Sequence, residues 1–473
     1  MTKNEDPAYS QLFSPTDFRY TVDDLKPILS EEAYVKYKAR VEAMLAKQFA
    51  KVGICSRPIA EEIARSCELV SAKEVYAEES RIKHDIRALA NVIRSRVSDS
   101  AKPYVHLAAT SYDVVDTANA LRLKEATKRV IIPDLVNLEN ALIEIALKYD
   151  SSVQIGRTHG QHAEPITFGF FISYYVSRLG QRILKINAAA DSLTGKFAGA
   201  VGVYGPLSLV LTDPEKFEND LLASLDLTPS EVSTQIVQPE PLTDLIHSIV
   251  STFGVLANFA RDLRNLQRTE IAEVSEEFLE MQVGSSTMPQ KRNPINFENI
   301  ESTWKKFMPQ MVTVYMDQIS EHQRDLTNSL SQRYLPELLV AFDSSVRRLT
   351  RTIWDGKRAR ARISIDSDSM KKNFDISADT VSAEPLYILL ALAGHPNAHE
   401  SVRSIVQRGL RENKSFHEIL KSDKELSKYL DKIPKDKWSV LNSPSKYTGI
   451  ASEKARRVAL SWKKKMKKLD RLP

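Results

Sequence analysis

The stretch LTDLIHSIVSTFGVLANFARDL, residues 242–263, indicates the fold more directly than any other part of the chain. Apolar residues recur there in steps of three and four, at Leu242, Leu245, Ile249, Phe253, Leu256, Ala260 and Leu263. This spacing puts them on one face of an α-helix, and so long a face needs helical partners along its whole length. The stretch therefore predicts one member of a bundle of long helices.

The same spacing recurs on the N-terminal side of this stretch. From Leu135 to Tyr149 the apolar residues again follow in steps of three and four. Ser56 is a candidate cap for an amphipathic helix over Ala60–Val70, and a longer helix is expected over Arg81–Val97. A capping box over Thr212–Glu215 predicts the start of a further helix.

Composition supports a helical fold. Only 15 of the 473 residues are glycine and 27% are charged, while 42% are hydrophobic, enough for a large core. Four of the glycines lie in GKFAGAVGVYGP, residues 195–206, where the backbone is expected to bend or pack tightly. No strand-like alternation of any length is found, so any sheet should be small and the fold class is all-α.

Charge and cysteine content exclude several classes of function. The formal charge is +5, and the basic run WKKKMKKLDR, residues 462–471, is expected to be a solvated helix face, since no nucleic-acid motif accompanies it. Cys55 and Cys67 form no CxxC pair, which argues against disulfides and structural zinc. The N-terminus lacks signal-peptide character, and the uncharged run Leu245–Ala260 is short for a membrane span. We expect a soluble cytoplasmic protein with no nucleic-acid or membrane partner.

The segment GSSTMPQKRNP, residues 284–294, has the composition of a ligand-binding loop. Pro289 and Pro294 interrupt regular backbone hydrogen bonding, and nearly every other side chain is polar or charged. Gly284 offers backbone freedom at its start. Lys291 offers charge to an anion and Ser285 an oxygen that can carry a proton. A solvated linker is the alternative interpretation from composition alone.

Three more blocks accompany this loop: TSYDVVDTA at 110–118, GRTHGQHAEPITFG at 156–169 and EHQRDLTNS at 321–329. The loop resembles the signature of the fumarase/aspartase superfamily, and the four blocks together, in this order, resemble the adenylosuccinate lyase family. The resemblance implies an N-terminal helical domain over 1–109, a central long-helix bundle over 110–362 and a C-terminal helical domain over 363–473. It also implies a homotetramer with shared active sites, and chemistry without a cofactor or metal.

Elimination of fumarate from a succinyl-amine needs a base beside a carboxylate and an acid at the departing nitrogen. The resemblance implies Ser285 as the base and His159 as the acid. Ser285 would act as an oxyanion held by neighbouring backbone amides and Lys291 once the loop has closed. A different base, with Ser285 only binding substrate, is the alternative. His162 would share a helical face with His159 if that segment were helical, but the residues around this pair do not complete a metal site.

The resemblance also implies a set of substrate-binding residues. They comprise groups for the purine nucleotide, its phosphate and the fumaryl carboxylates: Arg19, Tyr20, Lys83, His84, Asp85, His106, Thr110, Ser111, Gln235, Ser286, Lys291, Asn293, Asn299, Arg324, Ser329 and Arg333. The chain departs from the family pattern at Ala108 and Ala109, where glycine is common, and at Tyr112, where a small residue is usual.

The activity so implied is release of fumarate from adenylosuccinate and from succinylaminoimidazole carboxamide ribotide, in purine nucleotide synthesis. Argininosuccinate lyase or another fumarate-releasing lyase is the alternative, although arginines placed for a phosphate would have no purpose there. A catalytically silent helical scaffold is a rival of another class. The presence of Ser285, His159 and Lys291 argues against it.

Overall fold

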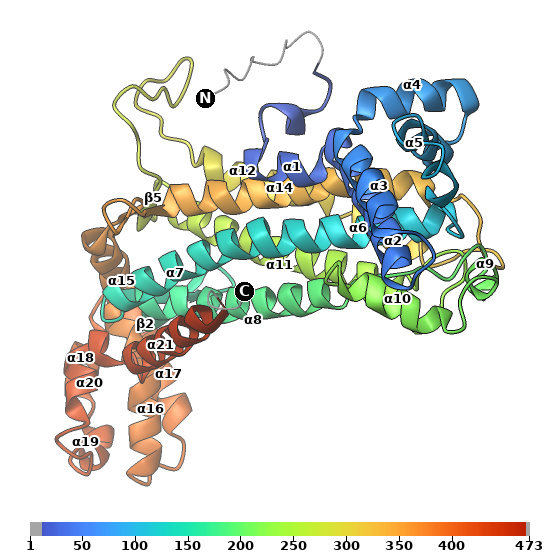
Figure 1. The fold of residues 1–473 in the computed structure, drawn as a ribbon. Helices are drawn as coiled ribbons and strands as arrows, with labels where there is room; N and C mark the ends of the chain where they lie inside the picture. Colours follow the sequence, from blue (N-terminus) through green and yellow to red (C-terminus); the bar gives the residue numbers. More distant parts are fainter. Residues whose placement is uncertain (1–11, 470–473) are drawn as a thin grey trace. The chain divides into compact units, whose positions relative to one another are not determined.

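The computed structural model describes residues 12–469, and these residues are predominantly α-helical (Figure 1). They form two compact units, each built from three stretches of the chain. Within the described residues, the first comprises 12–136, Gln181–Leu256 and Ser302–Arg347, and the second comprises Asn137–Gly180, Ala257–Glu301 and 348–469. The all-α fold class is confirmed, and the division into three domains remains a prediction.

Five helices contain the boundaries between the two units: α7 (Ile132–Lys148), α8 (Phe168–Asp191), α11 (Glu240–Leu266), α12 (Ile295–Phe307) and α14 (Ser329–Ile353). Two of them confirm the apolar stripes read from the sequence, because α11 contains 242–263 and α7 contains most of 135–149. The stripe residues of α11 from Leu245 to Leu263 are buried. By length and composition α11 would also suffice to cross a membrane, but 67% of its most apolar window is buried, as in a core helix.

In the first unit, α2 (Glu31–Lys51) packs against α3 (Arg57–Leu69) and α6 (Ser111–Ala126) (Figure 1). Its other helices are α1 (Lys26–Leu29), α4 (Ala72–Ile82), α5 (Asp85–Arg94), α9 (Gly205–Ser208), α10 (Pro214–Ala223) and α13 (Gln310–Met316). Two short strands, β3 (Thr194–Gly195) and β4 (Thr228–Pro229), pair in parallel. Ser56 occupies the N-cap position of α3, as predicted, but its side chain accepts no hydrogen bond from the first amides of the helix.

The second unit carries the antiparallel hairpin of β1 (Val153–Thr158) and β2 (Gln161–Thr167). Two smaller antiparallel pairs join β5 (Val274–Ser275) to β8 (Ser364–Ile365) and β6 (Trp354–Asp355) to β7 (Arg360–Ala361). Its remaining helices are α15 (Ser367–Val381), α16 (Ala383–Leu392), α17 (Ala398–Glu412), α18 (Phe416–Ser422), α19 (Lys424–Leu430), α20 (Trp438–Asn442) and α21 (Ala451–Leu469). Sheets are thus small in the described part of the chain.

The basic C-terminal run lies on α21, as expected for a solvated helix face. Trp462 and Met466 are buried, whereas the lysines between and after them point outward or pair with surface groups. Gly180 of α8 admits the Trp462 ring, since a Cβ on Gly180 would lie 2.4 Å from a ring carbon. The run therefore contributes packing on one face and charge on the other; Arg471 lies outside the described residues.

Two local predictions were wrong. The single helix expected over Arg81–Val97 is broken, because Lys83 ends α4 in the left-handed conformation with φ 59° and His84 starts α5 as its N-cap. Thr212 does not cap the next helix either. Asp213 caps α10 instead, its carboxylate accepting the Lys216 amide at 2.9 Å, and Pro214 takes the first helical position.

Candidate active site

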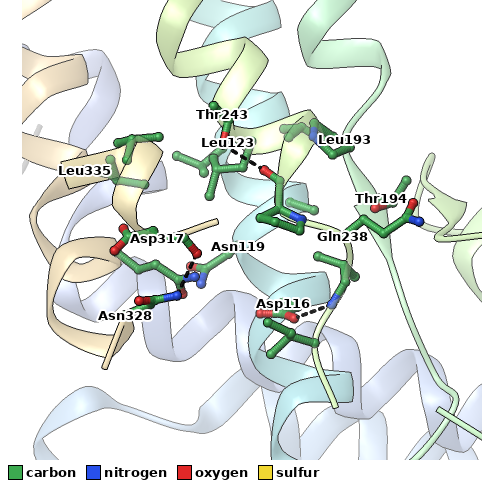
Figure 2. A pocket seen from close by; sticks show the side chains of 18 of the residues that line it. Asp116, Asn119, Leu123, Leu193, Thr194, Gln238, Thr243, Asp317, Asn328 and Leu335 are labelled. Carbon is green, nitrogen blue, oxygen red and sulfur yellow. Dashed lines mark hydrogen bonds between the residues drawn. The ribbon is translucent and has the colours of Figure 1, made fainter. Parts of the chain in front are cut away.

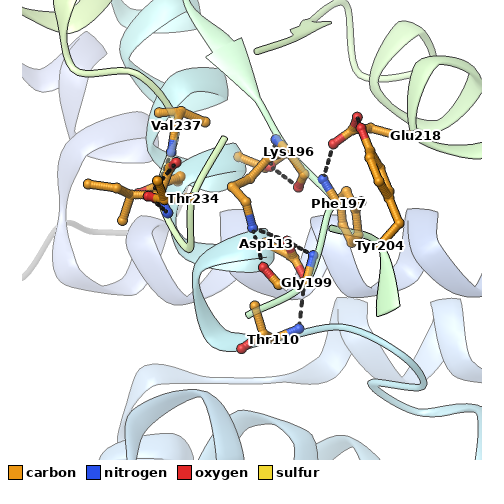
Figure 3. Close-up of polar contacts among 12 residues, drawn as sticks. Thr110, Asp113, Lys196, Phe197, Gly199, Tyr204, Glu218, Thr234 and Val237 are labelled. Atoms are coloured by element: carbon orange, nitrogen blue, oxygen red, sulfur yellow. Dashed lines mark hydrogen bonds and ion pairs between the residues drawn. The ribbon is translucent and has the colours of Figure 1, made fainter. Parts of the chain in front are cut away.

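The predicted carboxylate-binding pair, Thr110 and Ser111, lies at the N-terminus of α6 (Figure 3). The backbone N–H of Thr110 donates to the Asp113 carboxylate at 2.8 Å, and Ser111 is the first helical residue. Unpaired amides and the helix dipole at such an end attract anions. This end of α6 can therefore hold a substrate carboxylate.

A buried ion pair fixes this end of the helix. Lys196 donates to Asp113, and both side chains are almost completely buried. The Lys196 ammonium also donates to the Gly199 carbonyl at 3.1 Å, while the Gly199 amide donates to Asp113 at 3.2 Å (Figure 3). Sequence reasoning missed Lys196 and Asp113. Their only signal was that Asp113 lies in a family block and Lys196 in the glycine-rich segment.

His106 lies in the segment that leads to α6. Its Nδ1 is 2.6 Å from the buried Glu42 carboxylate of α2. Burial lowers the pKa of His106, but the charge and hydrogen bond of Glu42 outweigh this effect and raise it. His106 and Ala108 both have positive φ, 60° and 54°, a conformation that glycine would adopt with less strain than alanine at position 108.

The KHD segment forms the break between α4 and α5. His84 Nδ1 accepts the Arg87 amide at 3.3 Å, so a neutral imidazole carries its proton on Nε2, where it can donate to a ligand. Lys83 and Asp85 line a cavity of the first unit, together with Arg333 of α14. The structure thus brings these three predicted residues together.

The predicted phosphate cluster is divided between cavities. Arg324 lines a second cavity of the first unit and stacks its guanidinium 4.2 Å from the centre of the Tyr112 ring, donating a hydrogen bond to the Tyr112 hydroxyl. Arg324 Nε and Nη1 are buried and make no hydrogen bond within residues 12–469. Ser329 is the first residue of α14 and donates to the Leu326 carbonyl at 2.7 Å. Tyr112, where the chain departs from the family pattern, therefore positions the Arg324 guanidinium.

Figure 2 shows this second cavity, which Asp116 and Asn119 of α6 line together with Gln238 and Asn328. Burial raises the pKa of Asp116 to about 6, against the lowering effect of the Val237 amide, which donates to it at 3.0 Å. The cavity is therefore lined both by carboxylate oxygens that accept hydrogen bonds and by side-chain amides that can donate them.

Three predicted residues, Gln235, Arg19 and Tyr20, lie on loops of the first unit. The backbone N–H of Gln235 donates to the backbone carbonyl of Gln323 at 3.2 Å. This bond joins the Gln235 segment to the EHQRDLTNS block. Arg19 is exposed and follows a short 3₁₀-helix, Pro15–Asp17, whose N-cap Ser14 donates to Glu337 of α14 at 2.7 Å. Tyr20 donates its backbone N–H to the Pro15 carbonyl at 3.0 Å.

The general-acid candidate His159 lies in the second unit, at the exposed tip of the β1–β2 hairpin. Thr158 pairs with Gln161, so His159 and Gly160 form a two-residue turn, with φ 53° and 74°. Two positive φ values indicate a type I′ turn. His162 lies on β2, and its Nδ1 contacts the Ser377 hydroxyl at 2.9 Å. The condition of a shared helical face for the two histidines is therefore not met.

Glu273 anchors the hairpin. Its fully buried carboxylate accepts hydrogen bonds from Gln154 at 2.7 Å, from Arg157 through two nitrogens and from Asn373 at 2.8 Å. Because Glu273 directly precedes β5, the same contacts tie the hairpin to the segment that leads into the signature loop. Sequence reasoning missed Glu273.

The signature loop contains an arrangement suited to an oxyanion. Ser285 Oγ accepts the backbone N–H groups of Thr287 at 3.3 Å and Met288 at 3.0 Å. Hydrogen bonds to the charged form of a group favour that form, so these amides lower the cost of deprotonating the Ser285 hydroxyl. Ser286 and Lys291, which belong to the same loop, are exposed.

Gly284 and Asn293 close the base of the loop. Asn293 Nδ2 donates to the Gly284 carbonyl at 2.9 Å. A Cβ on Gly284 would lie 1.9 Å from the Lys291 carbonyl oxygen, so close packing of the two loop ends requires this glycine. Asn299 lies nearby in sequence on α12, whose first amides are capped by the Glu276 carboxylate at 3.0 Å. Within the described residues, no group of three or more His, Cys, Asp or Glu side chains is placed to hold a metal.

Comparison with known proteins places these features in a family. The family model described as "Lyase" matches residues 16–308. The adenylosuccinate lyase of Pyrococcus horikoshii is 33% identical over 94% of this chain and 96% of that protein, and the adenylosuccinate lyase of Methanocaldococcus jannaschii is 31% identical over 93% of this chain and 94% of that protein.

Solved structures agree in fold. The 3-carboxy-cis,cis-muconate lactonizing enzyme of Pseudomonas putida matches with a TM-score of 0.81 at 25% identity, covering 96% of this chain and 99% of that one. A fumarate lyase from Mesorhizobium matches with a TM-score of 0.80 at 20% identity, covering 93% and 98%. The chain belongs to the adenylosuccinate lyase family, within the wider group of lyases.

Proposed function

We propose that this protein is a carbon–nitrogen lyase that releases fumarate from adenylosuccinate, giving AMP, and from succinylaminoimidazole carboxamide ribotide. Near-complete coverage of adenylosuccinate lyases supports the substrate class. The observation that carries the mechanism is the pair of backbone amides directed at Ser285 Oγ.

Ser285 acts as the base. As an alkoxide it removes the proton beside a substrate carboxylate, and the Thr287 and Met288 amides stabilise the alkoxide. The resulting carbanion places further negative charge on that carboxylate. Preorganised donors there lower the barrier more than any other group, and we assign this task to Thr110, Ser111 and Lys291.

His159 protonates the departing nitrogen. Its place at a hairpin tip leaves the imidazole exposed for a ligand while Glu273 holds the strands beneath it. Asn293 closes the loop, and Asn299 and Ser286 contribute polar contacts beside it. On the nucleotide side, His84, His106 and Gln235 orient the base and ribose, and the arginines at 19, 324 and 333 bind phosphate.

The assembly is a homotetramer in which each site draws residues from three chains, and the protein is soluble and cytoplasmic. Each chain has three domains, over 1–109, 110–362 and 363–473. The reaction needs neither cofactor nor metal.

The test is release of fumarate, followed by its ultraviolet absorbance, from adenylosuccinate, the ribotide and argininosuccinate in separate reactions. We expect fumarate from the first two. Fumarate from argininosuccinate alone would replace this assignment with the alternative lyase, and none from any of the three would support a silent scaffold.

A further inference from the structure

A buried lysine outside all four sequence blocks faces the cavity that Lys83, Asp85 and Arg333 line. Lys38 of α2 is 3% exposed in its side chain. Its ammonium lies 3.9 Å from the Asp85 carboxylate and 4.1 Å from the centre of the Tyr34 ring. It makes no hydrogen bond with any residue between 12 and 469, so its donors are available to a ligand.

A buried ammonium without hydrogen-bonded acceptors destabilises the folded state. An ammonium removed from water needs hydrogen-bonded acceptors to offset its lost hydration, and a carboxylate 3.9 Å away is too distant for that. Burial lowers the pKa of Lys38, partly opposed by Asp85. An anion in the cavity would supply the missing acceptors.

A second cation shares the Tyr34 ring. The Arg122 guanidinium of α6 lies 4.3 Å from its centre, and the residue is only 4% exposed. Arg122 Nε donates to Asn119 at 3.1 Å, and its two terminal nitrogens have no partner in the part of the chain that the structure describes. Two buried cations with free donors therefore meet at one wall of the cavity.

The carboxylates of the cavity neutralise its cations only in part. Glu31 accepts the Tyr76 hydroxyl at 2.5 Å, and Asp85 accepts the Ile86 amide at 2.7 Å. Glu79 is the third acidic residue, so the cations Lys38, Lys83, Arg122 and Arg333 outnumber the acids. The lining favours an anionic ligand.

We propose that Lys38 and Arg122 join Arg333 in binding the phosphate monoester of the substrate, as additions to the arginines already assigned to it, and so select nucleotides over nucleosides. This inference rests on the proposed function. A phosphate offers acceptors both to the forked donors of Arg122 and to the ammonium of Lys38, and low exposure strengthens each contact.

The test is Lys38→Met, which keeps the length of the side chain and removes its charge. KM for adenylosuccinate should rise about tenfold or more, as for a lost hydrogen bond between charged groups, with kcat little changed. KM for succinyladenosine, the same substrate without phosphate, should not change. Inorganic phosphate should inhibit the wild type competitively and Lys38→Met about tenfold more weakly. Lys38→Arg should restore much of the phosphate affinity.

Lys36→Met is the matched control. It removes a lysine from the same helix whose ammonium donates to the Glu68 carbonyl at 2.8 Å and does not line the cavity. It should leave both KM values unchanged. Unfolding of Lys38→Met without ligand should need as much denaturant as the wild type, or more, because an unbonded buried charge is gone.

Three results would overturn the proposal: equal KM increases for the two substrates, unchanged inhibition by phosphate, or loss of stability in Lys38→Met without loss of phosphate affinity. Thermal stabilisation by inorganic phosphate separates this proposal from the proposed function. If the wild type releases no fumarate, phosphate should still raise its melting temperature, and raise that of Lys38→Met much less.

Discussion

The buried pair of Lys196 and Asp113 gives a sharp test of how the first unit is held together. Lys196→Met removes the ammonium and leaves the Asp113 carboxylate enclosed with, among residues 12–469, only the Thr110 and Gly199 amides as hydrogen-bond partners. Breaking a buried ion pair from one side costs about 3–5 kcal/mol, because the remaining charge is uncompensated. We expect a loss of this size in the free energy of unfolding.

The double variant Lys196→Met/Asp113→Asn should recover part of that loss, since no charge then remains buried. Lys216→Met is the surface control. Lys216 pairs with Asp220 at 2.9 Å in an exposed i,i+4 contact, so its loss should leave the free energy of unfolding nearly unchanged.

The assay is urea unfolding followed by circular dichroism at one fixed protein concentration, because assembly contributes to apparent stability. Thr110 and Ser111 sit on the helix end that the pair holds, so KM should rise in Lys196→Met as well. A Lys196→Met protein within about 1 kcal/mol of the wild type would refute the reasoning, since a buried charge cannot be left unpaired at so small a cost.

Three further predictions concern His106, the signature loop and assembly. Glu42 raises the pKa of His106 in the folded state. The pair therefore stabilises the protein fully below the unfolded pKa of about 6.5, and this stabilisation is lost as pH rises through the higher folded pKa. Glu42→Gln should remove this part of the pH dependence of urea unfolding. Amides 283–292 should exchange quickly without ligand and be protected by AMP plus fumarate in hydrogen-exchange mass spectrometry, and equal protection in both states would exclude loop closure. Inactive His159→Asn and Ser285→Ala chains, refolded together in equal amounts, should regain about a quarter of wild-type activity if acid and base come from different subunits, whereas hybrid tetramers without activity would place both on one chain.

The long helices were predictable because their signal is local. In α11 every third or fourth residue is apolar, and the fold only has to bury that face. The break between α4 and α5 was not predictable from spacing, because apolar residues continue across it. It depends on the positive φ of Lys83 and on the His84 cap, which a hydrophobic pattern does not encode.

Sequence patterns also could not predict the long-range contacts of the candidate site. Family blocks pointed to Ser285 and His159 by resemblance, but the contacts that shape the site join residues far apart in sequence. Lys196 and Asp113 are separated by 83 positions, and Glu273 and Gln154 by 119. Lys38 gave no signal, because a lysine on an amphipathic helix is usually solvated and only the fold shows it to be buried.

The most direct test of the central claim is single-turnover elimination by Ser285→Ala. If the Ser285 oxygen, held by the Thr287 and Met288 amides, is the base, this variant should bind adenylosuccinate with nearly wild-type affinity. It should form fumarate at least about a thousandfold more slowly, as expected when a group that acts only in the transition state is removed. Fumarate formation at more than a few per cent of the wild-type rate would contradict the account and assign the proton transfer to another residue.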